Sequence, residues 1–117
     1  MMAPRQLLII ASDPHLRHSL EFALEAEGYD VTSCGKINEA DSPERYACVI
    51  LDHRAVAAPT DDVLSFCKRA SPIVLLTGVP LPWLSRLVFQ VVQKPLLGEP
   101  LSRAVREALI SRHACSS

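Results

Sequence analysis

Short apolar runs recur along the chain, and several of them stop abruptly at a polar residue. Residues 6–11, 46–52 and 72–77 form runs of the length expected for strands that are buried on both faces. Residues 29–34 alternate between apolar and polar side chains, a pattern typical of a half-exposed or edge strand. Residues 89–93, FQVVQ, are expected to form the last strand. The pattern therefore predicts five strands.

Residues that start and stop helices lie between these runs. Asp13 can cap a helix that begins at Pro14, and Gly28 closes it where a left-handed backbone is favoured. Thr60 can cap another helix after the third strand. These signals predict one helix after the first strand and one after the third.

The remaining connections carry weaker or shorter helical patterns. Apolar residues at the helical period predict a last helix over residues 101–109. Residues 36–45 contain Pro43, which ends any helix there, and residues 83–88 allow only about one and a half turns. The second and fourth helices are therefore expected to be short. Strands that alternate with helices predict an α/β fold with a doubly wound parallel sheet and right-handed crossovers.

Composition narrows the class of protein. The 117 residues suffice for a core without a metal or disulfide, so we expect one domain over residues 1–117, with a core of about 6–112 and no effector domain. A net charge of −1 with interspersed signs argues against direct binding of nucleic acid. The N-terminal apolar run is too short for a secretory signal or a membrane span, which predicts a cytoplasmic protein without membrane contact. The four cysteines lack the paired spacing of zinc or redox sites.

Polar residues follow the carboxyl ends of the predicted strands. Asp52 and Thr77 each end a strand, Lys94 follows another, and residues 11–13 form the turn after the first. Ligands and chemistry in open α/β sheets collect outside these strand ends. Taken singly, Thr77 could simply end a strand and Lys94 could be a solvated loop charge. Together they indicate a site centred on Asp52.

In this order, from about residue 6 to residue 109, the sequence resembles the receiver domain of bacterial two-component response regulators. The resemblance implies a flavodoxin-like five-stranded parallel sheet with strand order 2-1-3-4-5. It also implies that Asp52 accepts a phosphoryl group from a histidine kinase, and that Thr77 and Lys94 contact the phosphoryl oxygens. Such phosphoryl transfer depends on positioning and on neutralising charge more than on covalent work by the protein.

The turn after the first strand departs from the receiver pattern. Receivers usually carry two adjacent acids there that hold Mg²⁺, and the aligned residues are Ala11 and Ser12. Because Mg²⁺ favours carboxylate ligands, Asp13 and Asp52 alone would bind it weakly, and Asp13 is better suited to capping. If the strand continues as far as Arg54, this residue shares a face with Asp52, and it could supply the missing positive charge. We hypothesise that phosphorylation of Asp52 is slow or absent.

The segment between the last two strands is short and rich in apolar side chains. These residues either close the core beneath an abbreviated helix or form an exposed docking patch, in which case dimerisation through this face is the concrete hypothesis. The residues in question are Trp83, Leu84, Leu87 and Phe89.

Three functions of different classes remain open. The first is a conventional stand-alone receiver that accepts a phosphoryl group, and the second is an atypical receiver, or pseudo-receiver, that acts through protein–protein interaction. The third is a small flavodoxin-like enzyme or nucleotide binder, which is disfavoured because the turn at residues 11–14 has no glycine to cradle a phosphate. We favour the second, a non-enzymatic phosphorelay module whose partners are a sensor kinase or a downstream signalling protein.

Overall fold

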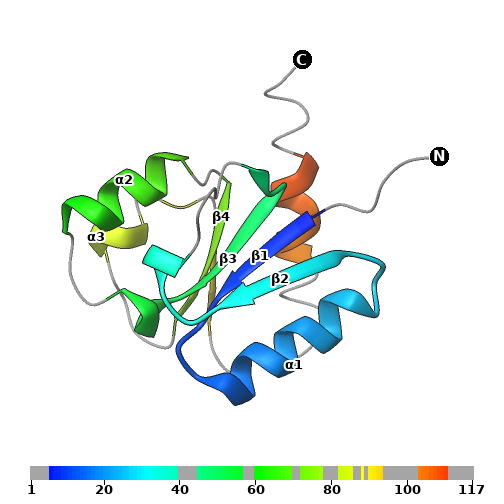
Figure 1. Cartoon of the computed structure of the whole chain (residues 1–117). Coiled ribbons are helices and arrows are strands. Elements are labelled where there is room, and N and C mark those ends of the chain that lie inside the picture. The colour runs from blue at the N-terminus through cyan, green and yellow to red at the C-terminus, as the bar shows by residue number, and fades with distance from the viewer. Residues whose placement is uncertain are drawn as a thin grey trace.

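The computed structural model describes residues 6–39, 45–56, 60–69, 72–77, 82–85, 88, 90–93 and 103–110. These residues contain one sheet of five parallel strands in the order β2-β1-β3-β4-β5 (Figure 1). The predicted doubly wound parallel sheet with strand order 2-1-3-4-5 is confirmed. The strands are β1 (Gln6–Ile10), β2 (Asp30–Cys34), β3 (Cys48–Asp52), β4 (Ile73–Thr77) and β5 (Gln90–Gln93).

Helices cover both faces of this sheet, as Figure 1 shows. Leu7 and Ile9 of β1 belong to one hydrophobic cluster, whereas Leu8 and Ile10 belong to another. Successive side chains of a strand point to opposite faces, so the two clusters lie on opposite sides of the sheet. The first cluster packs against α1 (Pro14–Glu25) and the helical residues 103–110, and the second packs against α2 (Asp61–Arg69) and α3 (Pro82–Ser85).

The central strands are enclosed completely. Every residue of β3 and of β4 is buried, whereas the edge strand β2 has only exposed or half-buried residues, as its alternating sequence predicts. Burying one large aliphatic side chain stabilises the fold by about 1.5–3 kcal/mol relative to leaving it exposed. A shift of β3 along its neighbours would bring an apolar residue to the sheet edge in place of Asp52. Because the apolar residues of β3 are held by burial, the position of the Asp52 carboxylate is fixed as well.

Side-chain caps set where the two longer helices begin. Asp13 accepts a hydrogen bond from the backbone N–H of His15 at 2.9 Å, and Thr60 Oγ1 accepts one from the backbone N–H of Val63 at 3.3 Å. Each cap satisfies an N–H group that has no partner within its helix. Gly28 follows α1 with a φ of 97°, in the left-handed region that favours glycine. The local signals read from the sequence therefore place both helices.

The second and fourth crossovers are short, as expected. The second contains the 3-10 helix η1 (Ile37–Glu39), and the fourth contains α3, which has 4 residues. The residues that flank these turns, 40–44 and 78–81, lie outside the described part of the chain.

The thiols behave as the spacing of the cysteines suggests. Cys34, Cys48 and Cys67 are free, with the last two buried, while Cys115 lies outside the described residues. Burial raises the pKa of the Cys67 thiol, which favours its neutral form. These cysteines act as small apolar side chains.

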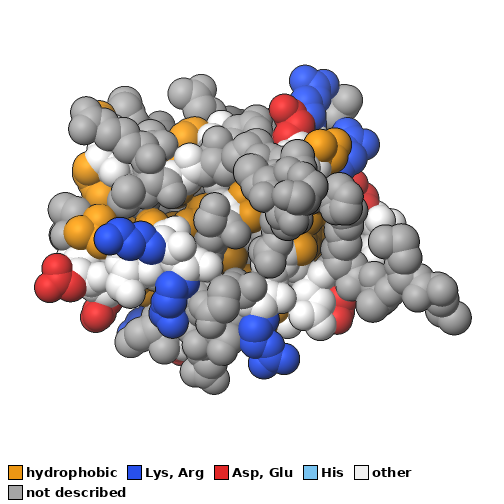
Figure 2. All heavy atoms as spheres, turned by 90° about the horizontal axis from the view of Figure 1, so that it is seen from above, with side chains coloured by type: hydrophobic (Ala, Val, Ile, Leu, Met, Phe, Trp, Pro, Cys, Tyr) orange, Lys and Arg blue, Asp and Glu red, His pale blue; other side chains and the backbone are white. Residues whose placement is uncertain are grey.

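Charged side chains are dispersed over the surface. On the face shown in Figure 2, the coloured Lys and Arg side chains lie at several separate places and form no continuous basic patch. This dispersal of the coloured side chains agrees with the net charge of −1. Among the helices that the structure describes, none has the length and hydropathy needed to cross a membrane.

Candidate functional site

Asp52 is the last residue of β3, and it has no exposed surface. The strand register pairs it with Leu76 of β4, and on the other side Leu51 pairs with Ile10 of β1. The turn that follows Ile10 therefore reaches the flank of Asp52. The carboxylate lies at the carboxyl edge of the sheet, between the ends of two neighbouring strands, where the sequence places it.

Arg54 folds back onto this carboxylate. The chain turns directly after Asp52 into the 3-10 helix η3 (His53–Ala55), so the strand does not continue as far as Arg54. The tight turn nevertheless brings Nε of Arg54 to 3.4 Å from Oδ2 of Asp52. The side chain of Arg54 is 50% exposed, whereas that of Asp52 is 0% exposed. The partly exposed guanidinium of Arg54 therefore covers the buried carboxylate of Asp52.

Asp13 meets the same guanidinium from the turn after β1. One of its oxygens, Oδ1, caps α1, while Oδ2 lies 3.5 Å from Nη2 of Arg54. The hydrogen bond from the backbone N–H of His15 lowers the pKa of the Asp13 carboxyl below its ordinary value of 3.8, and the positive charge of Arg54 lowers it further. Asp13 is therefore ionised at neutral pH and available as a second partner for Arg54.

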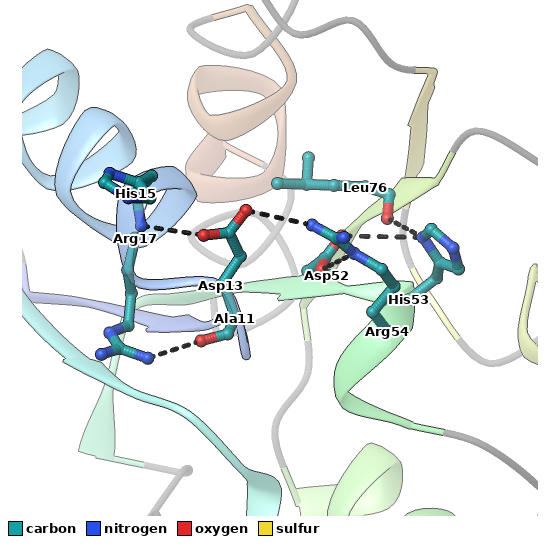
Figure 3. A network of polar contacts seen from close by, with 8 residues as sticks. All are labelled: Ala11, Asp13, His15, Arg17, Asp52, His53, Arg54 and Leu76. Carbon is teal, nitrogen blue, oxygen red and sulfur yellow. Dashed lines mark hydrogen bonds and ion pairs between the residues drawn. The ribbon is translucent and has the colours of Figure 1, made fainter.

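The guanidinium of Arg54 thus lies between two carboxylates that are 39 residues apart in the sequence, as Figure 3 shows. An arginine has five N–H donors in a planar fork and suits this bridging geometry better than a lysine would. The attraction between Arg54 and Asp52 acts partly through protein, where screening by water is weaker than at the surface. One positive charge consequently offsets charge on both Asp52 and Asp13.

His53 also faces Asp52, which no pattern in the sequence indicated, because the four histidines are dispersed along the chain. Its Nδ1 lies 3.6 Å from Oδ1 of Asp52 and 3.3 Å from the backbone carbonyl of Leu76 (Figure 3). The only signal in the sequence was its position next to Asp52. Nitrogen-bearing side chains therefore approach both oxygens of this carboxylate.

A further contact braces the turn after β1. Nη1 of Arg17 donates a hydrogen bond to the backbone carbonyl of Ala11 at 2.8 Å (Figure 3). The same nitrogen lies close to Gly35, where a Cβ atom would be 3.3 Å from it. Ala11 is fully buried, and its backbone N–H donates to the carbonyl of Cys34. The turn that carries Asp13 is therefore fixed to both β2 and α1. Sequence reasoning missed Arg17, because its partner is a backbone oxygen and not another side chain.

Thr77 and Lys94 complete the set of residues expected around Asp52. Thr77 ends β4, is 3% exposed and pairs with Gln93 of β5. Because Asp52 pairs with Leu76, Thr77 lies one residue beyond it on the neighbouring strand. Lys94 lies outside the described residues. The contacts of both with a phosphoryl group stay predictions.

The apolar segment before β5 is described only in part. Trp83 is half-buried and packs against the cluster on the α2 face of the sheet. That packing favours a structural role for this side chain. The side chains of Leu84, Leu87 and Phe89 lie outside the described part of the chain.

The receiver resemblance implies a magnesium ion near Asp52, and the residues present do not fit one. Ala11 has no side-chain donor and Ser12 has a neutral hydroxyl, whereas Mg²⁺ needs hard oxygen ligands in near-octahedral geometry. The carboxylates of Asp52 and Asp13 both face Arg54, whose positive charge would repel a divalent ion. Within the described residues, no three His, Cys, Asp or Glu side chains are grouped so that they could hold a metal ion.

Comparisons with known proteins agree with this fold. No family model matches the sequence. The transcriptional regulator protein FixT of Rhizobium meliloti is 25% identical over 113 residues, which cover 95% of this chain and 98% of that protein.

Among solved structures, a response regulator receiver domain protein from Clostridium thermocellum has a TM-score of 0.79 at 19% identity, covering 95% of this chain and 98% of its own. A CheY-like receiver domain protein from Methanospirillum hungatei has a TM-score of 0.78 at 18% identity, covering 96% and 98% of the two chains. The chemotaxis protein CheY4 of Vibrio cholerae has a TM-score of 0.74 at 21% identity, covering 92% and 100%. The chain therefore has the fold of response-regulator receiver domains, as its sequence predicts.

Proposed function

We propose that this protein is an atypical receiver of two-component signal transduction, in which Arg54 takes the place of the metal ion. The observation that carries the proposal is the position of its guanidinium, within 3.5 Å of the carboxylates of both Asp52 and Asp13. A cation supplied by the chain itself is always present, unlike an ion that binds and leaves. The carboxyl edge of the sheet is thus held in one state.

This arrangement opposes phosphorylation of Asp52. Transfer of a phosphoryl group needs positive charge on the developing oxygens, and in two-component proteins magnesium supplies much of it. Arg54 is already bound to Asp52 and to Asp13, so placing the phosphoryl group would first require breaking those contacts. Acyl phosphate formation at Asp52 is consequently slow or absent.

Output then depends on recognition by other proteins. The protein is not an enzyme in this proposal, and it acts in the cytoplasm by binding a sensor kinase or a downstream signalling protein. FixT, which this chain matches over nearly its full length, is named as a transcriptional regulator. We propose that this protein likewise controls transcription, and that it does so through a protein partner. The net charge of −1 disfavours direct binding to DNA.

The competing function is a conventional receiver that accepts a phosphoryl group at Asp52. Incubation with acetyl phosphate and Mg²⁺, followed by intact mass spectrometry, separates the two. The atypical receiver gives little or no added phosphoryl mass over hours, and Asp52→Asn behaves like the unmodified sequence. A rapid adduct that Asp52→Asn abolishes, or millimolar-or-tighter binding of Mg²⁺ at Asp52, would overturn the proposal.

Dimerisation through the segment that carries Trp83 is a separate proposal. Apolar residues are concentrated in that short stretch of sequence, and contiguous exposed apolar surface usually marks a site for a protein partner. Light scattering at micromolar concentration tests it directly. A monomeric mass across the whole concentration range would rule this dimer out.

A further inference from the structure

A hollow of about 340 Å³ opens beside Asp52, at the carboxyl ends of β1, β2 and β3. Its volume lies within the range of small-molecule sites, which is about 300–1,000 Å³. In a sheet of this strand order, the connections that follow β1 and β3 leave toward opposite faces of the sheet, and the crevice outside the ends of these two strands is where ligands bind. The lining residues are Ser12, Gly35, Lys36, Ile37, Arg54, Ala55, Thr60 and Asp62.

Two cations from different connections line this hollow. Lys36 follows β2, and its side chain is exposed, while its backbone N–H is bound to Glu39. Arg54 follows β3 and uses Nε and Nη2 in its contacts with Asp52 and Asp13. A guanidinium has five N–H donors, so further donors remain for a ligand in the hollow. Lys36 and Arg54 thus bring positive charge to the hollow from two different connections.

Neutral groups form another part of the lining. Thr60 Oγ1 accepts a hydrogen bond from the backbone of Val63, which leaves its O–H free to donate, and Ser12 supplies a second hydroxyl. Ile37 is half-buried and gives the hollow an apolar wall. A few polar groups that converge beside apolar surface are typical of small-ligand sites.

We propose that this hollow binds a small organic anion whose phosphate or carboxylate group lies between Lys36 and Arg54. The hydroxyls of Ser12 and Thr60 donate to its oxygens, and its body packs on Ile37. Asp62 lines the hollow as well, and its negative charge disfavours multiply charged ligands and favours one that also carries an N–H or O–H donor. This binding activity goes beyond the signalling role, and it can be tested without phosphorylating Asp52.

Arg54 couples the hollow to Asp52, because it lines the first and contacts the second. An anion in the hollow competes with Asp52 and Asp13 for the guanidinium, and thermodynamic linkage makes this competition reciprocal. Removing the charge of Asp52 must therefore tighten anion binding. The ligand would loosen the contacts that hold the carboxyl edge of the sheet, which gives the protein an input other than phosphorylation.

Titration of the full chain with inorganic phosphate, and separately with acetate, tests the site by amide NMR at low ionic strength. We expect saturable shifts at Gly35, Lys36 and Ile37 with at least one of the two probes. Lys36→Ala removes a charge-assisted hydrogen bond and should weaken binding by about tenfold or more. The matched control is Lys68→Ala, an exposed lysine on α2 outside the hollow, which should leave binding unchanged.

A second pair of variants examines the charge inside the hollow. Asp62→Asn should tighten phosphate binding several-fold, whereas Asp61→Asn, which changes the neighbouring exposed residue outside the lining, should have a smaller effect. Asp52→Asn should also tighten binding, because it releases Arg54. Shifts that do not saturate, or equal losses in Lys36→Ala and Lys68→Ala, would overturn the site and leave only a diffuse surface effect. Since these results do not involve phosphorylation, they can fail while the signalling proposal stands.

Discussion

The guanidinium of Arg54 reaches Asp52 across only two residues of chain, with Nε 3.4 Å from Oδ2, because η3 begins directly after β3. The same turn leaves Nη2 of Arg54 3.5 Å from Asp13, on the connection after β1. The same side chain thereby contacts Asp52 within its own turn and Asp13 far away in the sequence. Arg54 consequently couples the ends of two central strands at the carboxyl edge of the sheet.

Removing the guanidinium should destabilise the protein. Arg54→Ala takes away an ionic partner of a fully buried carboxylate, but Arg54 is itself half exposed, so we expect a loss of about 1–2 kcal/mol in the free energy of unfolding. Urea denaturation at pH 7 measures it. In the double variant Asp52→Asn/Arg54→Ala, the carboxylate charge is absent, and the further cost of losing Arg54 should be much smaller. Equal costs in both backgrounds would show that the two residues do not interact.

Restoring an acid while removing the arginine should create a magnesium site. Ser12→Asp/Arg54→Ala would place a new carboxylate at an exposed position beside Asp13 and remove the charge that repels a divalent ion. We expect Mg²⁺ binding in the double variant that is absent or much weaker in either single variant, measured by isothermal titration calorimetry. If Arg54→Ala alone bound Mg²⁺ as tightly as the double variant, the missing acid would not be the limiting feature.

The loss of folding stability at acidic pH should depend on Asp13. Its pKa is lowered in the folded protein, so its ionised form stabilises the fold at pH values above 3.8, and this contribution is lost as the pH falls through the lower, folded value. Asp13→Asn keeps a residue that can cap α1 but removes the charge. We expect the difference in melting temperature between the two proteins to shrink between pH 5 and about pH 3, followed by circular dichroism.

Asp13→Ala separates the cap from the charge in that comparison. Alanine loses both, so it should be less stable than Asp13→Asn at neutral pH and also at acidic pH, where charge no longer distinguishes the variants. A difference between Asn and Ala that vanished at low pH would mean that the cap contributes nothing.

Gly28 should resist substitution for a reason that is purely conformational. Its φ of 97° is unfavourable for residues with a side chain, yet no atom lies within 4 Å of the place where a Cβ would be. Gly28→Ala should therefore cost about 1–2 kcal/mol through backbone strain, without a clash. Gly28→Asn should cost less, because asparagine tolerates this region better. Urea denaturation of the three proteins tests the order, and a Gly28→Ala variant as stable as the unmodified protein would contradict it.

Much of the fold follows from features that act over short distances in the chain. The uninterrupted apolar runs predicted the buried strands, because only a strand covered on both faces tolerates apolar side chains at every position. Asp13, Thr60 and Gly28 marked helix ends, because caps act within three residues of the groups that they satisfy. The alternating pattern of β2 likewise identified an edge strand with one solvated side.

Only those residues of the candidate site that lie at strand ends could be predicted from the sequence. Asp52 and Thr77 could be placed at the edge of the sheet because each ends an apolar run, and parallel strands share that edge. The path of the chain after Asp52 was left open by the sequence, and the structure shows a 3-10 turn there instead of a continued strand. The position of His53 and the contact of Arg17 with the carbonyl of Ala11 had no periodic signal at all.

By itself, the sequence determined that a carboxylate ends a buried central strand of a parallel α/β sheet and that the usual acids beside it are replaced by Ala11 and Ser12. Only the tertiary structure decided what that carboxylate contacts. The meeting of Asp52, Arg54 and Asp13 depends on the register of β1 against β3 and on the direction of one turn, and both are fixed by packing across the whole sheet. Interactions between distant segments have no local signature, because their energy arises only when the chain has folded.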